Sequence, residues 1–80
     1  MLIEIYTKKD CPACARTKAL LINHGYVFTE HEMGRDITRE ELLNRFPAAK
    51  FVPIITIDNE QVNPDEKSLL LLLENTARTI

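Results

Sequence analysis

The sequence is poor in several features that define whole classes of protein. No apolar run approaches the ~20 residues of a membrane-spanning helix, since the longest is the leucine run 69–73. Ten Lys and Arg against twelve Asp and Glu give a net charge of -2, without the basic stripe typical of nucleic-acid-binding proteins. Glu4 and Lys8 interrupt the short apolar start, so we expect no export signal and a cytoplasmic location. The composition therefore argues against both a membrane and a nucleic acid as partners.

Cysteine is also scarce, and its scarcity limits what the thiols do. Two cysteines in 80 residues are too few for a disulfide-rich scaffold. A hydrophobic fraction of 45% with 28% charged residues is ordinary globular composition, and the length leaves room for one core. We therefore expect a single domain over residues 1–80, in which the cysteines serve catalysis or metal binding.

The first part of the chain predicts a strand, a helix and a second strand. Residues 1–6 are rich in Leu and Ile, which favours a short strand. Pro12 suits the first position of a helix that the spacing extends to about Asn23, and Gly25 is a helix stop. Residues 26–32 predict the second strand. Such a unit joins two parallel strands by a right-handed crossover.

A helix and a hairpin follow. Thr38 with Glu41 three residues later forms a capping box, and the helix it opens ends near Phe46 because a proline comes next. The apolar residues 54–57 predict a strand. A two-residue turn then leads into a returning strand at 60–62.

The last predicted helix begins with a strong start signal. Asn63 is expected as its N-cap, with Pro64 at the first helical position and Glu66 in the first turn. The leucines 69–73 lie further along it. The complete order, β-α-β-α-β-β-α, predicts an α/β fold with a four-stranded mixed sheet flanked by three helices.

The two cysteines, Cys11 and Cys14, stand two residues apart just before the first helix. A structural zinc site needs four ligands, but there is no second cysteine pair, and the positions of His24 and His31 match no zinc-finger spacing. We therefore assign no metal site. A structural disulfide across two residues closes a loop too short to stabilise the fold much.

Redox exchange suits both positions. Cys11 is expected at the helix N-terminus, where free N–H groups and the macrodipole favour an anion over a thiol, whose ordinary pKa is about 8.5. Cys14, one turn into the helix, is expected to face inward. We interpret Cys11 as the nucleophile and Cys14 as the resolving thiol that attacks the mixed disulfide on Cys11. A CxxC pair between the strand and helix of a βαβ unit is typical of redox proteins.

Two segments resemble the dithiol glutaredoxins. Residues 6–14, YTKKDCPAC, are similar to the active-site segment of that family, as is the helix through residue 21. Residues 51–57 resemble the family's Thr-Val-Pro loop and the strand after it. The resemblance covers nearly the whole chain. It implies a thioredoxin-like fold of the minimal glutaredoxin type, a redox disulfide between Cys11 and Cys14, and glutathione as reducing co-substrate with no bound cofactor.

The same resemblance assigns roles to residues outside the cysteine pair. It implies a cis peptide bond before Pro53 and a Val52 backbone that offers its N–H and C=O to an extended peptide. Phe51 stands where the family has Thr, beside this peptide. Lys8 and Arg39 occupy positions that bind glutathione carboxylates in the family.

The chain departs from the family pattern at the positions expected to meet the γ-glutamyl end of glutathione. Asp65 or Glu66 is expected to meet the γ-glutamyl amine. Asn63 and Pro64 replace the usual Gly-Gly, and Pro64 removes one N–H that could bind the γ-glutamyl carboxylate. Ala13 also stands where the family has an aromatic residue.

The resemblance implies a monomeric thiol–disulfide oxidoreductase that reduces protein disulfides and glutathione mixed disulfides. Ribonucleotide reductase is the protein substrate that the family most suggests. Two alternatives remain open. One is a glutaredoxin-like thioredoxin that thioredoxin reductase recharges, and the other is a non-enzymatic module that holds a metal or an iron–sulfur cluster.

Overall fold

The computed structural model describes residues 1–78, in which strands and helices follow the predicted order. The four strands are β1 (Ile3–Thr7), β2 (Thr29–Glu32), β3 (Ile54–Ile57) and β4 (Glu60–Val62). The three helices are α1 (Pro12–Asn23), α2 (Arg39–Arg45) and α3 (Glu66–Arg78). No helix among these residues is long and apolar enough to span a membrane.

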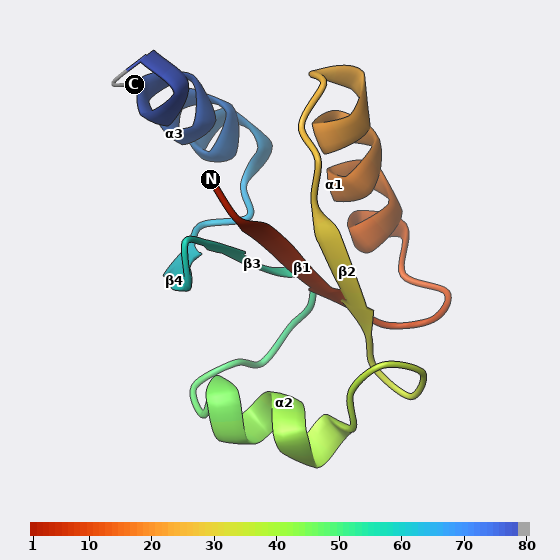
Figure 1. Ribbon diagram of the computed structural model, residues 1–80. Coiled ribbons are helices and arrows are strands. Elements are labelled where there is room, and N and C mark those ends of the chain that lie inside the picture. The colour runs from red at the N-terminus through yellow and green to blue at the C-terminus, as the bar shows by residue number, and fades with distance from the viewer. Residues whose placement is uncertain (79–80) are drawn as a thin grey trace.

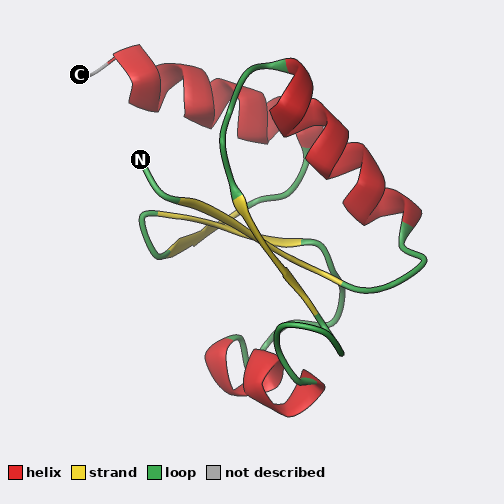
Figure 2. Cartoon of the chain, turned by 45° about the vertical axis from the view of Figure 1, so that its right-hand side comes forward, coloured by secondary structure: helices red, strands yellow, loops and turns green. Residues whose placement is uncertain are grey.

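The strands form one mixed sheet in the order β2-β1-β3-β4. β1 pairs with β2 in parallel, whereas β3 runs antiparallel to both β1 and β4. The parallel pair follows from the helical crossover α1, and the antiparallel pair from the short turn between β3 and β4. Helices α1 and α3 lie on one side of the sheet and α2 on the other (Figure 1, Figure 2). The predicted four-stranded mixed sheet and thioredoxin-like element order are confirmed.

Each face of the sheet packs against its own helices. Alternating residues of β1 and β3 point to opposite faces, because side chains alternate along a strand. The larger core, on the side of α1 and α3, contains Ile3, Ile5, Leu21, Ile55, Ile57, Leu69 and Leu73. The smaller core, beneath α2, contains Tyr6, Ile37, Leu42 and Ile54.

Local signals set the ends of α2 and the hairpin as predicted. The Thr38 hydroxyl accepts the Glu41 N–H at 3.0 Å, and Glu41 Oε1 accepts the Thr38 N–H at 3.2 Å, which completes the capping box. Phe46 is the C-cap of this helix. Asp58 and Asn59 have φ values of 51° and 69°, as a two-residue hairpin turn with left-handed residues requires.

Two predicted boundaries are wrong. Strand β2 begins at Thr29 rather than at residue 26, because the Tyr26 N–H donates to the Leu21 carbonyl at the end of α1 instead of to a neighbouring strand. Asn63 is not the N-cap of the last helix. Its Oδ1 accepts the Asp65 N–H at 2.9 Å in a local turn, and α3 begins at Glu66.

Candidate active site

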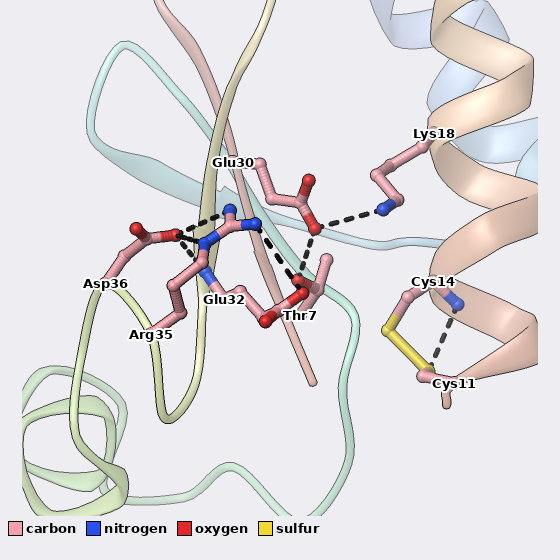
Figure 3. Close-up of polar contacts among 8 residues, drawn as sticks. All are labelled: Thr7, Cys11, Cys14, Lys18, Glu30, Glu32, Arg35 and Asp36. Atoms are coloured by element: carbon pink, nitrogen blue, oxygen red, sulfur yellow. Dashed lines mark hydrogen bonds and ion pairs between the residues drawn. A yellow bond between two sulfur atoms is a disulfide. The ribbon is translucent and has the colours of Figure 1, made fainter. Parts of the chain in front are cut away.

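The cysteine pair lies where the chain leaves β1 and enters α1. Cys11 and Cys14 are joined by a disulfide, and their Cα atoms are 5.2 Å apart (Figure 3). Cys11 is half-buried, whereas Cys14 is only 2% exposed. A disulfide partner therefore reaches Cys11 more readily than Cys14, as the assignment of nucleophile and resolving thiol requires.

The start of α1 presents a donor to the outer sulfur. Cys11 is the N-cap, with an extended backbone, and Pro12 occupies the first turn. The Cys14 N–H points at Cys11 Sγ, with the nitrogen 3.2 Å from the sulfur. When the disulfide is reduced, a donor and a helix N-terminus at this position favour a thiolate on Cys11, which is the form that attacks disulfides.

The Val52–Pro53 peptide bond is cis, as the glutaredoxin resemblance implies. Within residues 1–78, no protein group hydrogen-bonds to the Val52 N–H or C=O. Pro53 has no N–H to offer. The N–H and C=O of Val52 can therefore both bind an extended ligand.

Two grooves meet at this peptide bond. The first, here called the acidic groove, has a volume of about 280 Å³. The second, here called the basic groove, has a volume of about 200 Å³. Pro53 lines the acidic groove together with Ala13, Arg16, Thr17, Leu20, Pro64, Asp65 and Glu66. Val52 lines the basic groove together with Lys8, Met33, Arg39, Leu42, Leu43, Ala49, Lys50 and Phe51.

The structure places every predicted ligand-binding residue in one of these grooves. Lys8, Arg39, Phe51 and Val52 line the basic groove, and Pro53, Asp65 and Glu66 line the acidic one. The set is thus divided between the two sides of the Val52–Pro53 bond. Phe51 is 84% exposed, so its ring is accessible to a partner.

Two charged residues of these grooves were not predicted. Arg16 lines the acidic groove and Lys50 lines the basic groove. Arg16 could have been found from the sequence, because it lies five residues after Cys11 on the helix that carries the cysteine pair. Lys50 could not, since its position depends on how the loop before Val52 folds back toward α2.

A polar network ties the first helix to the sheet near the cysteines (Figure 3). Glu30 Oε2 accepts the Thr7 hydroxyl at 2.6 Å and the Lys18 ammonium at 3.0 Å. The Thr7 hydrogen bond, aided by Lys18, lowers the pKa of Glu30 below its ordinary value despite the opposing effect of burial. Lys18 lies one turn beyond Cys14, so the network helps to hold the helix that carries both cysteines. Nothing in the sequence pattern singled out this network.

The histidines are placed away from the cysteine pair. His31 Nε2 lies 2.7 Å from Glu4 Oε2, and its ring stacks on that of Tyr6. His24 caps the C-terminal end of α1. Within residues 1–78, no three His, Cys, Asp or Glu side chains are grouped as metal ligands.

Comparisons with known proteins agree with this geometry. The sequence profile of the family described as Glutaredoxin matches residues 3–62. Glutaredoxin 3 of Escherichia coli is 43% identical over 61 residues, which cover 75% of this chain and 72% of that protein. A probable glutaredoxin of Synechocystis sp. is 38% identical over 61 residues, which cover 75% of this chain and 69% of its own.

Solved structures show the same relationship. The glutaredoxin from Brucella melitensis superimposes with a TM-score of 0.68 at 30% identity, covering 99% of this chain and 84% of that one. The crystal structure of a thioredoxin-like protein gives a TM-score of 0.73 at 28% identity, covering 88% of this chain and 97% of that one. With its CxxC pair at the start of α1, the chain belongs to the glutaredoxin family and is a thiol–disulfide oxidoreductase.

Proposed function

We propose that this protein reduces protein disulfides and glutathione mixed disulfides through Cys11 and Cys14, with electrons supplied by glutathione. The observation that carries the proposal is the meeting of two oppositely charged grooves at Val52–Pro53. Ala13, which stands between the two cysteines, lines one groove, and Lys8, which precedes Cys11 by three residues, lines the other. Glutathione is a short extended peptide with a carboxylate at its glycine end and a zwitterion at its γ-glutamyl end. Its charges therefore match those of the two grooves.

The reaction proceeds by two thiol–disulfide exchanges. The Cys11 thiolate attacks one sulfur of the substrate, which forms a mixed disulfide and expels the other sulfur as a thiolate. The Cys14 thiolate then attacks the Cys11 sulfur, which releases the reduced substrate and leaves the Cys11–Cys14 disulfide. One glutathione opens this disulfide and remains bonded to Cys11, and a second glutathione removes the first as glutathione disulfide. Two electrons pass from two glutathione molecules to one substrate disulfide.

Each part of glutathione has a partner in the proposed complex. The glycine carboxylate binds Lys8 and Arg39 in the basic groove. The Val52 backbone pairs with the cysteinyl residue, and Phe51 and Pro53 flank it. The γ-glutamyl amine binds Asp65 or Glu66 in the acidic groove. No metal or other bound cofactor takes part.

The proposal also covers the protein's location, its oligomeric state and its protein substrate. We assign it to the cytoplasm as a monomer, with ribonucleotide reductase as the first protein substrate to test, because the resemblance to small dithiol glutaredoxins suggests all three. Size-exclusion chromatography with light scattering tests the monomer. Reduction of oxidised ribonucleotide reductase by the pre-reduced protein tests the substrate.

One observation favours a second candidate. Pro64 has no N–H, and the Asp65 N–H already donates to Asn63 Oδ1, so neither residue offers a backbone donor to a γ-glutamyl carboxylate in the acidic groove. A glutaredoxin-like thioredoxin, recharged by thioredoxin reductase, does not need this end of the site.

A coupled assay separates the two candidates. A small mixed disulfide is reduced with glutathione and glutathione reductase in one arm and with NADPH and thioredoxin reductase in the other. We expect turnover with glutathione that Cys11→Ser abolishes. Turnover only in the thioredoxin reductase arm would overturn the glutathione proposal while leaving the roles of the cysteines intact.

A further inference from the structure

The charged residues that line the two grooves are divided largely by sign. The basic groove presents Lys8, Arg39 and Lys50, with no acidic side chain among its described lining residues. The acidic groove presents Asp65 and Glu66 against a single cation, Arg16. Glutathione needs one cationic subsite for its glycine carboxylate, so the further cation Lys50 calls for another explanation.

The backbone of Val52 sets the direction of a bound peptide. In an antiparallel pair, two opposite residues can exchange both hydrogen bonds, each giving its N–H and accepting at its C=O. In a parallel pair, the two groups of one residue bond to two different residues of the partner. The antiparallel pair is therefore the arrangement that satisfies both Val52 groups with one ligand residue.

That direction relates the two grooves to the two halves of the peptide. The loop runs from Lys50 and Phe51 in the basic groove, through Val52, to Pro53 in the acidic groove. An antiparallel ligand therefore passes its N-terminal half beside Pro53. Its C-terminal half passes beside Phe51 and Lys50.

We propose that the site selects protein substrates by charge order, favouring a reactive cysteine with a basic residue before it and an acidic residue after it in an extended segment. This inference rests on the proposed function and names the substrate class of that site. Lys50 and the Asp65–Glu66 pair are the residues that set the preference. Oppositely charged groups meet on both sides of the cysteine in this order, and like charges meet in the reverse order.

Two peptides of identical composition test the order. One reads Lys-Ala-Cys-Ala-Glu and the other Glu-Ala-Cys-Ala-Lys, each acetylated and amidated so that the termini carry no charge. Each is oxidised to a mixed disulfide with 2-mercaptoethanol. Pre-reduced protein then reduces the peptide in a single turnover, giving the free peptide thiol, 2-mercaptoethanol and the Cys11–Cys14 disulfide. No recycling system is needed, so this result does not depend on glutathione.

We expect the first peptide to react about threefold to tenfold faster at low salt, as two partly exposed ion pairs allow. The preference should shrink at about 1 M salt, where the screening length is about 3 Å. Lys50→Glu should weaken the preference, because it replaces one of the three cations of the basic groove by an anion. Lys67→Glu makes the same charge change on an exposed residue outside both grooves and should leave it in place.

Equal rates at low salt, a preference for the second peptide, or a preference that Lys50→Glu leaves unchanged would each overturn the inference. Failure of the proposed function has a different signature. In that case the single-turnover preference is observed, but adding glutathione and glutathione reductase gives no repeated turnover of either peptide.

Discussion

Two buried threonines offer a matched test of how hydrogen bonding stabilises this sheet. Thr7 at the end of β1 is 1% exposed and Thr56 in β3 is 4% exposed. The Thr7 hydroxyl donates to Glu30 Oε2 at 2.6 Å. Within residues 1–78, the Thr56 hydroxyl has no hydrogen-bond partner. The same change to valine, which has nearly the same shape, therefore removes a satisfied group at one site and an unsatisfied one at the other.

We expect the two substitutions to have opposite signs. A buried hydroxyl without a partner costs about 1–3 kcal/mol, so Thr56→Val should raise the free energy of unfolding by about 1–2 kcal/mol. Thr7→Val removes a hydrogen bond to a carboxylate and should lower that free energy by about 1–2 kcal/mol. For a domain of this length, each kcal/mol moves Tm by about 4–8 °C.

Urea denaturation and differential scanning calorimetry measure both effects. Unchanged urea m-values would show that the substitutions alter stability rather than the denatured state. If Thr56→Val lowers the stability, or if both variants shift in the same direction, then pairing of the hydroxyl is not what distinguishes the two sites. Turnover of a small mixed disulfide by each variant shows that the native fold is kept.

Three further predictions concern the thiols, the polar network and the core. Cys14→Ser should keep turnover of glutathione mixed disulfides but lose reduction of protein disulfides. A substrate protein should remain bonded to Cys11, because no thiol is left to resolve the mixed disulfide. Mass spectrometry under non-reducing conditions detects this mixed disulfide, and its absence would contradict the roles assigned to the two cysteines. Glu30→Gln should lower stability by about 1 kcal/mol at pH 6, because a partly exposed charged acceptor is lost. Because the pKa of Glu30 is lowered in the folded protein, its contribution is present above the ordinary pKa of 4.5 and is lost as pH falls through the lowered value. The difference in urea stability between variant and wild type should therefore shrink as pH is lowered from 4.5. A difference that stays constant would refute this. Leu69→Ala, at a fully buried position, should destabilise by about 2–5 kcal/mol, whereas Leu71→Ala, at a position 57% exposed, should change stability by less than about 0.5 kcal/mol. Similar losses in the two leucine variants would mean that burial in α3 does not decide their contribution.

Several elements were predictable because their signals are local. Pro12 and Gly25 bracket the first helix, and Thr38 with Glu41 opens the second. These signals act through hydrogen bonds and backbone preferences within a few residues. They are therefore the same in the sequence and in the folded chain.

The start of α3 shows where a local signal is ambiguous. Asn63 and Asp65 are both good N-caps, and Pro64 suits the first helical position only if Asn63 is the cap. In the structure, the Asn63 side chain accepts the Asp65 N–H, and Asp65 Oδ2 accepts the Ser68 N–H at 3.3 Å. The chain thus makes a further turn after β4, and Asp65 takes the role expected of Asn63.

The sequence by itself determined the order of the elements and the placing of the cysteine pair at the head of a helix. The resemblance to glutaredoxins added the cis bond before Pro53. Only the tertiary structure decided that Arg16 and Lys50 line grooves on opposite sides of that bond, and that Thr7, Lys18 and Glu30 share one network. The reason is distance along the chain. Caps and turns depend on neighbouring residues, whereas a groove or a polar network joins segments that meet only when the sheet has formed.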